Sequence, residues 1–184
     1  MAAKNLTELF SNKIFRIPDY QRGYAWIDKQ LDELWDDIDE IKEIDGELKK
    51  HYMGTIYLEK TEPLLTEKWI SGHTFYNIVD GQQRLTTLCI LLFELLNSTE
   101  TGYCEESKSN LYQTFISKAN LSGASKVYKF GYTNTDKNHS FLYNSIFEDN
   151  SIIVEHDQLN LYRKNLLFAK NFFNAKIADL NPEE

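Results

Sequence analysis

The amino-acid sequence predicts an α+β fold, with a small mixed β-sheet, flanking helices and a mainly helical C-terminal part. Short apolar or alternating runs, typical of strands, interleave with longer segments whose apolar residues recur at spacings of three and four, typical of helices. The chain has 184 residues, of which 42% are hydrophobic and 26% charged, as in globular proteins. This length favours one domain, spanning residues 1–184, with a sizeable core.

The first half of the chain alternates between the two patterns. Residues 5–12 are typical of a short capped helix, and the alternating run at 14–17, stopped by Pro18, indicates a short strand or an edge segment. A helix is expected next, capped by Asp28 and ended by Gly46, with an apolar stripe that reaches Ile41 and Ile44. A strand is expected at 52–59, where Gly54 allows a close approach of another backbone. A polar connection at 60–73, a strand at 74–79 and a helix to about Leu96 follow.

The second half is more helical. Residues 97–109 have the composition of a loop, and the pattern at 111–116 leaves strand and helix open. The elements expected after these are a strand at 127–132, a turn or cap at 134–136, and helices at 137–147 and 159–180. Within the single domain, residues 5–96 are therefore expected to form the core that carries the motifs, and 110–180 a mainly helical continuation.

Composition excludes several classes of protein. The net charge of −8 gives no support for nonspecific nucleic-acid binding, although a local basic pocket stays compatible with it. Neither a signal peptide nor an apolar run of membrane-spanning length is present, and the two cysteines lack metal-binding spacing, so a cytoplasmic protein without a metal centre is expected. We expect Cys89, inside an apolar run, to be buried. The acidic residues at 32–40 are interpreted as a solvated helix face.

The most informative segment runs from Asp80 to Leu88, between two apolar runs. The pattern predicts a strand that ends, turns at Gly81 and starts a helix, whose free N–H groups and positive dipole end suit an anion such as phosphate. Gly81 permits the turn and a close ligand approach, and Arg84 offers a fork of donors to phosphate oxygens. The other polar positions have these expected roles: Gln82 and Gln83 orient water or bind a ligand edge, Thr86 and Thr87 offer hydroxyls, and Asp80 holds Arg84, caps the helix or binds Mg²⁺ through water.

A plainer interpretation of this segment is an ordinary cap and turn with surface glutamines. The segment is not a Walker A sequence, because it lacks the glycine–lysine–serine ending. The second polar segment, residues 18–26, interleaves aromatic residues with an amide and a guanidinium. Tyr20 and Tyr24, beside Gln21 and Arg22, suit stacking on a base or lining a pocket; the alternative is a loop whose aromatics pack on the next helix, as we expect for Trp26.

Four segments together resemble one family, the N-terminal domain of GmrSD-type, modification-dependent (type IV) restriction proteins. They are Ile17-Pro18-Asp19-Tyr20-Gln21-Arg22-Gly23-Tyr24-Ala25-Trp26, Leu34-Trp35-Asp36-Asp37-Ile38, Tyr52-Met53-Gly54-Thr55-Ile56 and Asp80-Gly81-Gln82-Gln83-Arg84-Leu85-Thr86-Thr87-Leu88. The resemblance is strong over 5–96 and weaker beyond, and it implies a ParB/sulfiredoxin-like fold. It also implies binding and hydrolysis of GTP or another NTP in support of DNA restriction.

The resemblance assigns roles to residues of both motifs. It implies catalytic roles for Asp80, Gln82, Gln83 and Arg84, and it places Tyr20, Gln21 and Arg22 on the other wall of the pocket. Gly81, Thr86 and Thr87 are expected to bind phosphate because of their place at the turn and in the first helical turns. On this hypothesis Arg84 and Arg22 clamp phosphates, a glutamine positions water, and Asp80 organises Mg²⁺ or Arg84.

Two functional hypotheses follow from the resemblance. The first is an NTP-hydrolysing regulatory domain of a restriction and phage-defence system; the second is a non-catalytic sensor that binds a nucleotide or modified DNA in the same pocket. A third hypothesis is a purely structural domain that contacts a partner subunit. DNA and an HNH-type nuclease domain or subunit are the implied partners, since the four histidines show no His-Asn-His spacing. Self-association, turnover by this chain and the identity of the NTP stay open.

Overall fold

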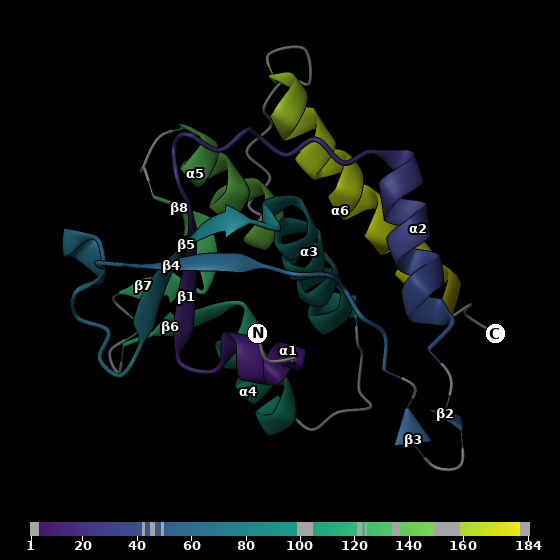
Figure 1. The fold of residues 1–184 in the computed structure, drawn as a ribbon, viewed down its shortest axis with the longest axis horizontal. Coiled ribbons are helices and arrows are strands. Elements are labelled where there is room, and N and C mark those ends of the chain that lie inside the picture. The colour runs from purple at the N-terminus through teal and green to yellow at the C-terminus, as the bar shows by residue number, and fades with distance from the viewer. Residues whose placement is uncertain are drawn as a thin grey trace.

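A mixed four-stranded sheet with the strand order β4-β5-β1-β8 forms the centre of the molecule (Figure 1). The computed structural model describes residues 4–41, 43–44, 47–48, 50–98, 105–120, 123, 125–133, 137–148 and 159–180. The sheet comprises β1 (Lys13–Ile17), β4 (Tyr57–Thr61), β5 (Thr74–Asp80) and β8 (Phe130–Tyr132). Because β1 is parallel to both β5 and β8, whereas β4 is antiparallel to β5, the predicted α+β class with a small mixed sheet is confirmed.

Helices flank this sheet and dominate the end of the chain, as expected. They are α1 (Leu6–Phe10), α2 (Asp28–Asp39), the 3-10 turn η1 (Leu65–Glu67), α3 (Gln82–Ser98), α4 (Glu105–Phe115), α5 (Lys137–Phe141), the π-helix η2 (Leu142–Phe147) and α6 (Leu161–Leu180). Two small antiparallel pairs complete the described chain: β2 (Glu43–Ile44) with β3 (Glu47–Leu48), and β6 (Ser117–Ala119) with β7 (Lys126–Tyr128). None of the described helices is both long and apolar enough to cross a membrane.

The N-terminal elements follow from local chemistry. Asn5 caps α1: its side chain accepts from the Glu8 N–H at 2.8 Å, while the Glu8 carboxylate accepts from the Asn5 N–H at 3.1 Å. The edge interpretation of the next strand is wrong, because β1 lies between β5 and β8, with Phe15 opposite Tyr76 on one side and Phe130 on the other. Pro18 falls just after β1, so the strand keeps its ladder hydrogen bonds.

Several predicted boundaries are wrong. In α2 the cap is Ile27, whose N–H donates to Gln30 Oε1 at 3.1 Å, and Asp28 is the first helical residue. The helix ends at Asp39, and Ile44 belongs to β2. The strand expected at 52–59 is shifted to 57–61, and residues 105–109 are helical because α4 begins at Glu105. Residues 111–115, where strand and helix were both open, are helical, and the strand expected at 127–132 is divided between β7 and β8.

The predicted helix at 137–147 continues as a π-helix over its last six residues, and the long C-terminal helix is found as α6. The turn expected at 134–136 and the second cysteine, Cys104, lie outside the described residues.

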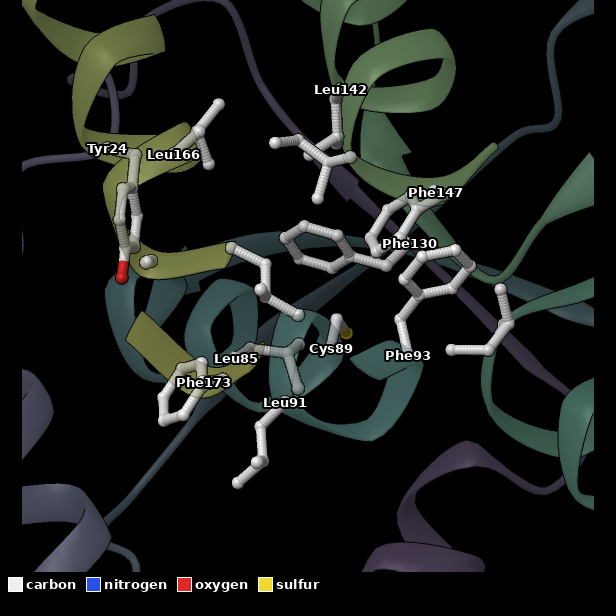
Figure 2. Packing of buried hydrophobic residues seen from close by; sticks show 14 of the residues in the cluster. Tyr24, Leu85, Cys89, Leu91, Phe93, Phe130, Leu142, Phe147, Leu166 and Phe173 are labelled. Atoms are coloured by element: carbon white, nitrogen blue, oxygen red, sulfur yellow. The ribbon is translucent and has the colours of Figure 1, made fainter. Parts of the chain in front are cut away.

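The main core lies between one face of the sheet and the packed pair α3 and α6 (Figure 2). Phe15 and Ile17 of β1 point into it, as alternate positions of a strand do. Helix α3 supplies Leu85 and Ile90, both fully buried, and α6 supplies Phe173. Cys89 is buried as expected, and burial raises the pKa of its thiol, so it serves as a small core residue.

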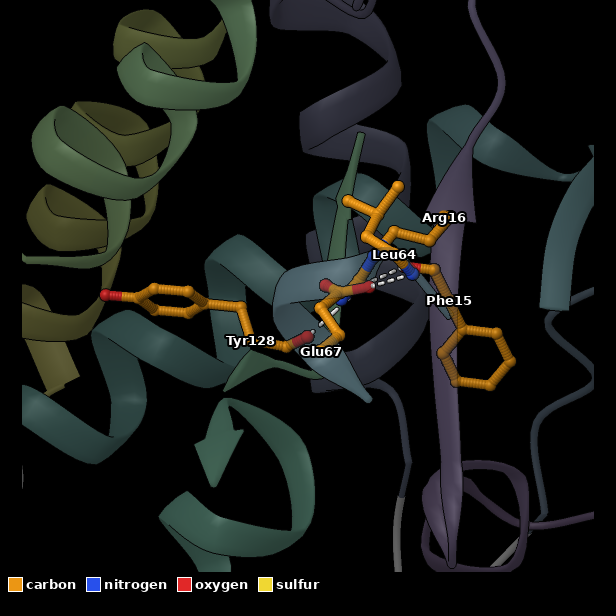
Figure 3. Close-up of polar contacts among 5 residues, drawn as sticks. All are labelled: Phe15, Arg16, Leu64, Glu67 and Tyr128. Carbon is orange, nitrogen blue, oxygen red and sulfur yellow. Dashed lines mark hydrogen bonds and ion pairs between the residues drawn. The ribbon is translucent and has the colours of Figure 1, made fainter. Parts of the chain in front are cut away.

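The other face of the sheet carries a smaller apolar cluster and a buried ion pair. Ile14 and Phe75 pack there with Val127, and Arg16, only 2% exposed, lies among them. Figure 3 shows the Arg16 guanidinium paired with the Glu67 carboxylate of η1. Arg16 also donates to the backbone oxygens of Phe15 at 2.8 Å and Tyr128 at 3.2 Å. The pair therefore fastens η1 and β7 to the centre of the sheet.

Candidate functional site

The parallel strands β1, β5 and β8 end at one edge of the sheet, and both polar motifs begin there. The Asp80 motif follows β5, the 18–26 segment follows β1, and Thr133 follows β8. Ligands of sheets that contain parallel strands bind outside their carboxyl ends, where loops and helix N-termini converge. We call this region the carboxyl edge.

At this edge, Gly81 makes the turn from β5 into α3. Its φ is +88°, and a Cβ atom there would lie 3.0 Å from Ile56 Cγ1 and 3.3 Å from the Thr55 oxygen, so a side chain would be strained as well as crowded. Leu85 donates its N–H to the Gly81 oxygen at 3.0 Å. The preceding N–H groups, of residues 82–84, have no partner within the helix by its geometry. The predicted strand, glycine turn and helix start are confirmed.

The two glutamines bind the backbone of the other motif. Gln82 Nε2 donates to the Arg22 oxygen at 2.8 Å, and Gln83 Nε2 donates to the Gly23 oxygen at 3.2 Å. Gln83 Oε1 also accepts from the Ala25 N–H at 2.8 Å. Both side chains are buried, at 4% and 8% exposure, so the interpretation as surface glutamines is wrong. The sequence-distant motifs thus form one hydrogen-bonded unit.

Further hydrogen bonds hold the 18–26 segment from both sides. Gln21 Nε2 donates to the Val79 oxygen at 2.9 Å, and the Tyr24 hydroxyl lies 2.8 Å from Thr87 Oγ1. Tyr24 is fully buried, which raises the pKa of its phenol. Because its ring is buried, Tyr24 is not available to stack on a base. Asn165 of α6 donates to the Tyr24 oxygen at 3.2 Å.

The threonine hydroxyls of the motif form hydrogen bonds within α3. Thr86 Oγ1 donates to the Gln82 oxygen at 2.8 Å and Thr87 Oγ1 to the Gln83 oxygen at 2.9 Å, each one turn back. Both residues are buried, so they support the start of the helix from within.

Arg84 binds the loop before β4. Its guanidinium donates to the Met53 oxygen at 3.0 Å and to the Thr55 oxygen at 2.7 Å. Gly54 lies against it: φ is +87°, and a Cβ atom would be 1.7 Å from Arg84 Nη1. The predicted close approach at Gly54 is confirmed, with a side chain rather than a backbone as the neighbour. Among the described residues, no carboxylate pairs with Arg84, Asp80 included.

Exposed charged groups remain at the carboxyl edge. Within the described ranges, the side chains of Arg22 and Asp80 are exposed and make no ion pair or hydrogen bond. Tyr20, two residues before Arg22 in the same segment, is 71% exposed. Asp19 accepts a hydrogen bond from Thr133 Oγ1 at 3.1 Å. The edge thus offers a free guanidinium, carboxylates and an aromatic ring to a ligand.

A cavity of about 160 Å³ opens on the other side of Arg84, between α2 and residues 51–53. Its walls include Trp26, which packs against the main core. Glu33 and Asp37 of α2 line it, and His51 Nε2 lies 3.5 Å from Asp37 Oδ2. We call this space the α2 cavity.

Sequence reasoning missed two residues of α6 that complete the site. One is Asn165, described above. The other is Tyr162, whose ring lies so close to Gly23 that a Cβ atom there would be 2.2 Å from its Cγ. The glycine between Arg22 and Tyr24 was the available signal, because an aromatic ring packed on the backbone requires a residue without a side chain.

Comparison with known protein families agrees with this geometry. The family model described as "GmrSD restriction endonuclease, N-terminal domain" matches residues 6–182. The chain therefore belongs to this family, and it is the N-terminal domain of a restriction protein. A search of curated proteins finds no match.

Proposed function

We propose that this GmrSD N-terminal domain binds a nucleoside triphosphate, GTP or ATP, at the carboxyl edge and hydrolyses it to regulate DNA restriction. One observation carries the proposal. The hydrogen bonds of Gln82 and Gln83 fix the 18–26 segment against the start of α3. They hold the Arg22 backbone at this helix N-terminus, while the Arg22 side chain stays exposed and unpaired among the described residues. A free guanidinium and unpaired helix N–H groups are the donors that phosphate oxygens prefer.

The residues divide into two roles in this proposal. Arg22 and Asp80 contact the ligand, Arg22 at the phosphates and Asp80 through Mg²⁺. The described residues contain no group of three metal-ligating side chains, yet Mg²⁺ in nucleotide sites is held by one or two carboxylates together with the phosphates, which fits Asp80. Gln82, Gln83 and Arg84 act as positioning residues that hold the segments around the helix start. Bound Mg²⁺ would supply charge neutralisation at the phosphates.

The exposed ring of Tyr20 favours a second candidate, a sensor without turnover. An aromatic ring that is 71% exposed beside a free arginine suits stacking on a base of modified DNA. In that case the domain would bind its ligand, be stabilised by it and release no phosphate.

Phosphate release and thermal stability, measured with GTP and ATP, with and without Mg²⁺ and DNA, separate these functions. We expect turnover in the wild type and at least a tenfold loss in Arg22→Ala and in Asp80→Asn, with unfolding temperatures unchanged in the absence of ligand because both side chains are exposed. Lys68→Ala and Asp39→Asn are matched exposed controls and should keep full turnover. Stabilisation without phosphate release would favour the sensor, and neither stabilisation nor release would contradict the proposal.

A further inference from the structure

We infer that the α2 cavity receives the nucleobase of the bound triphosphate, and that its carboxylates select guanine. The inference rests on the proposed function, and it adds a base-recognition site at a distance from the carboxyl edge. The route between the two places is short. Arg22 at the edge and Trp26 in the cavity wall are four residues apart in one segment, a span of at most about 14 Å. Arg84, in the first turn of α3, lines the cavity from the other side.

The volume of the cavity fits a base. Its volume of about 160 Å³ compares with the roughly 150 Å³ of a protein cavity that accepts a benzene ring. One aromatic ring system therefore fills it, and a ribose with three phosphates would have to lie outside. The proposed function puts those phosphates at the start of α3.

The charges of the walls also favour a base over phosphate. Glu33 and Asp37 lie on one wall, with 64% and 53% of their side-chain surface exposed. Two carboxylates repel the several negative charges of a triphosphate, and they accept hydrogen bonds from a neutral base. The Arg84 guanidinium, which also lines the cavity, already donates to the oxygens of Met53 and Thr55.

Aromatic side chains supply stacking surfaces in the same place. Trp26 is half-buried in the wall, and Tyr52 is 74% exposed at the rim. The Tyr52 hydroxyl lies 2.7 Å from Thr55 Oγ1, which restrains the ring in its position. Stacking on such rings suits every base, so it provides affinity without discrimination.

Discrimination comes from the carboxylates. Guanine presents the N1–H and the N2 amine side by side, two donors that a single carboxylate accepts together. Adenine presents one exocyclic amine next to a ring nitrogen that is an acceptor. The same carboxylate therefore accepts only one hydrogen bond from adenine, and its second oxygen faces another acceptor. A site that hydrogen-bonds both donors therefore rejects the base that lacks one of them.

Equilibrium binding of GTP, ATP, inosine triphosphate and inorganic triphosphate to the chain, followed by calorimetry, tests this inference. We expect the wild type to bind GTP at least tenfold more tightly than ATP, with inosine triphosphate between them because it lacks the N2 amine. In the Glu33→Gln/Asp37→Asn double variant, the ratio of GTP to ATP affinity should fall to within about twofold of unity. The matched control is a neighbouring exposed pair, Asp36 in α2 and Glu40 at its C-cap, changed in Asp36→Asn/Glu40→Gln; it should keep the wild-type ratio.

The outcomes separate this inference from the proposed function. Equal affinity of the wild type for GTP and ATP, or an unchanged ratio in a folded double variant, would overturn guanine selection by the α2 cavity while nucleotide binding stands. Failure of all four ligands to bind would instead overturn the proposed function, and with it the inference.

Discussion

Arg16 and Arg84 both donate to backbone oxygens, but their surroundings differ. Arg16, on the sheet face opposite the main core, is almost fully enclosed, and the Glu67 carboxylate neutralises its charge. Arg84 lies half-buried beside a cavity, binds two carbonyl oxygens, and has no carboxylate partner among the described residues. The first arrangement is complete in itself and holds the fold together. The second keeps a net positive charge next to a helix N-terminus, where an anion is favoured.

The largest expected effect comes from breaking the enclosed pair. Arg16→Met leaves the Glu67 carboxylate buried without a counter-charge, which should lower the free energy of unfolding by about 3–5 kcal/mol. Urea denaturation measures this. The double variant Arg16→Met/Glu67→Met removes both charges and should recover much of the loss. A single variant that costs under about 1 kcal/mol would show that the pair is not enclosed as described.

A somewhat smaller effect is expected where Arg84 meets Gly54. Gly54→Ala places a methyl group against the guanidinium and strains a positive φ, so we expect a loss of about 1–3 kcal/mol. Gly72→Ala is the matched control, since φ there is +73° and a Cβ atom would meet nothing within 4 Å. Thermal or urea unfolding of both variants separates contact from backbone strain. Equal losses would mean that the approach of Arg84 contributes nothing.

Lys129 extends the comparison to a buried cation that pairs with no carboxylate among the described residues. It is 3% exposed, and burial, then the charges of Lys118 and Lys13, lowers the pKa of its ammonium to about 8. Between pH 8 and the unfolded value of about 10.4, the unfolded chain binds more protons, so stability should rise with pH in this window, by less than about 1.4 kcal/mol per unit. Below pH 8 the ammonium is protonated in both the folded and the unfolded chain, so the destabilisation that its burial causes is fully present there. Unfolding of wild type and Lys129→Met across this range should show a difference that shrinks with pH; a constant difference would contradict the shift.

The smallest effect concerns the hydroxyl bond inside the site. Thr87 Oγ1 already donates to the Gln83 oxygen, so the Tyr24 hydroxyl is the donor in the bond between them. Tyr24→Phe leaves Thr87 with its other bond, and we expect a loss of about 1 kcal/mol. A double-mutant cycle with Thr87→Val measures the coupling of the pair. Zero coupling would mean that the contact does not stabilise the fold.

Local chemistry made part of this molecule predictable. The strand, glycine turn and helix around Gly81 follow from patterns within a few residues, as does the Asn5 cap. The burial of Cys89 likewise follows from its place in an apolar run. The α+β class follows from the alternation of the same patterns along the chain.

The features that could not be predicted from the sequence depend on contacts between residues far apart in the chain. Arg16 occupies a polar position in an alternating strand, which by itself suggests exposure, and its partner Glu67 is 51 residues away. Gln83 finds its acceptor 60 residues away, so its burial could not be deduced from its neighbours. The shift of β4 and the early end of α2 likewise depend on tertiary pairing, which overrides local propensity.

The hydrogen bond from Asn165 to Tyr24 spans 141 residues, and it bears on how the protein is made. During synthesis, the segments that surround the start of α3 leave the ribosome long before α6. At about 5–20 residues per second, several seconds pass before the last helix can close over Gly23 and Tyr24. A nascent chain that already carries both motifs therefore has an unfinished carboxyl edge until the C-terminal helix has docked.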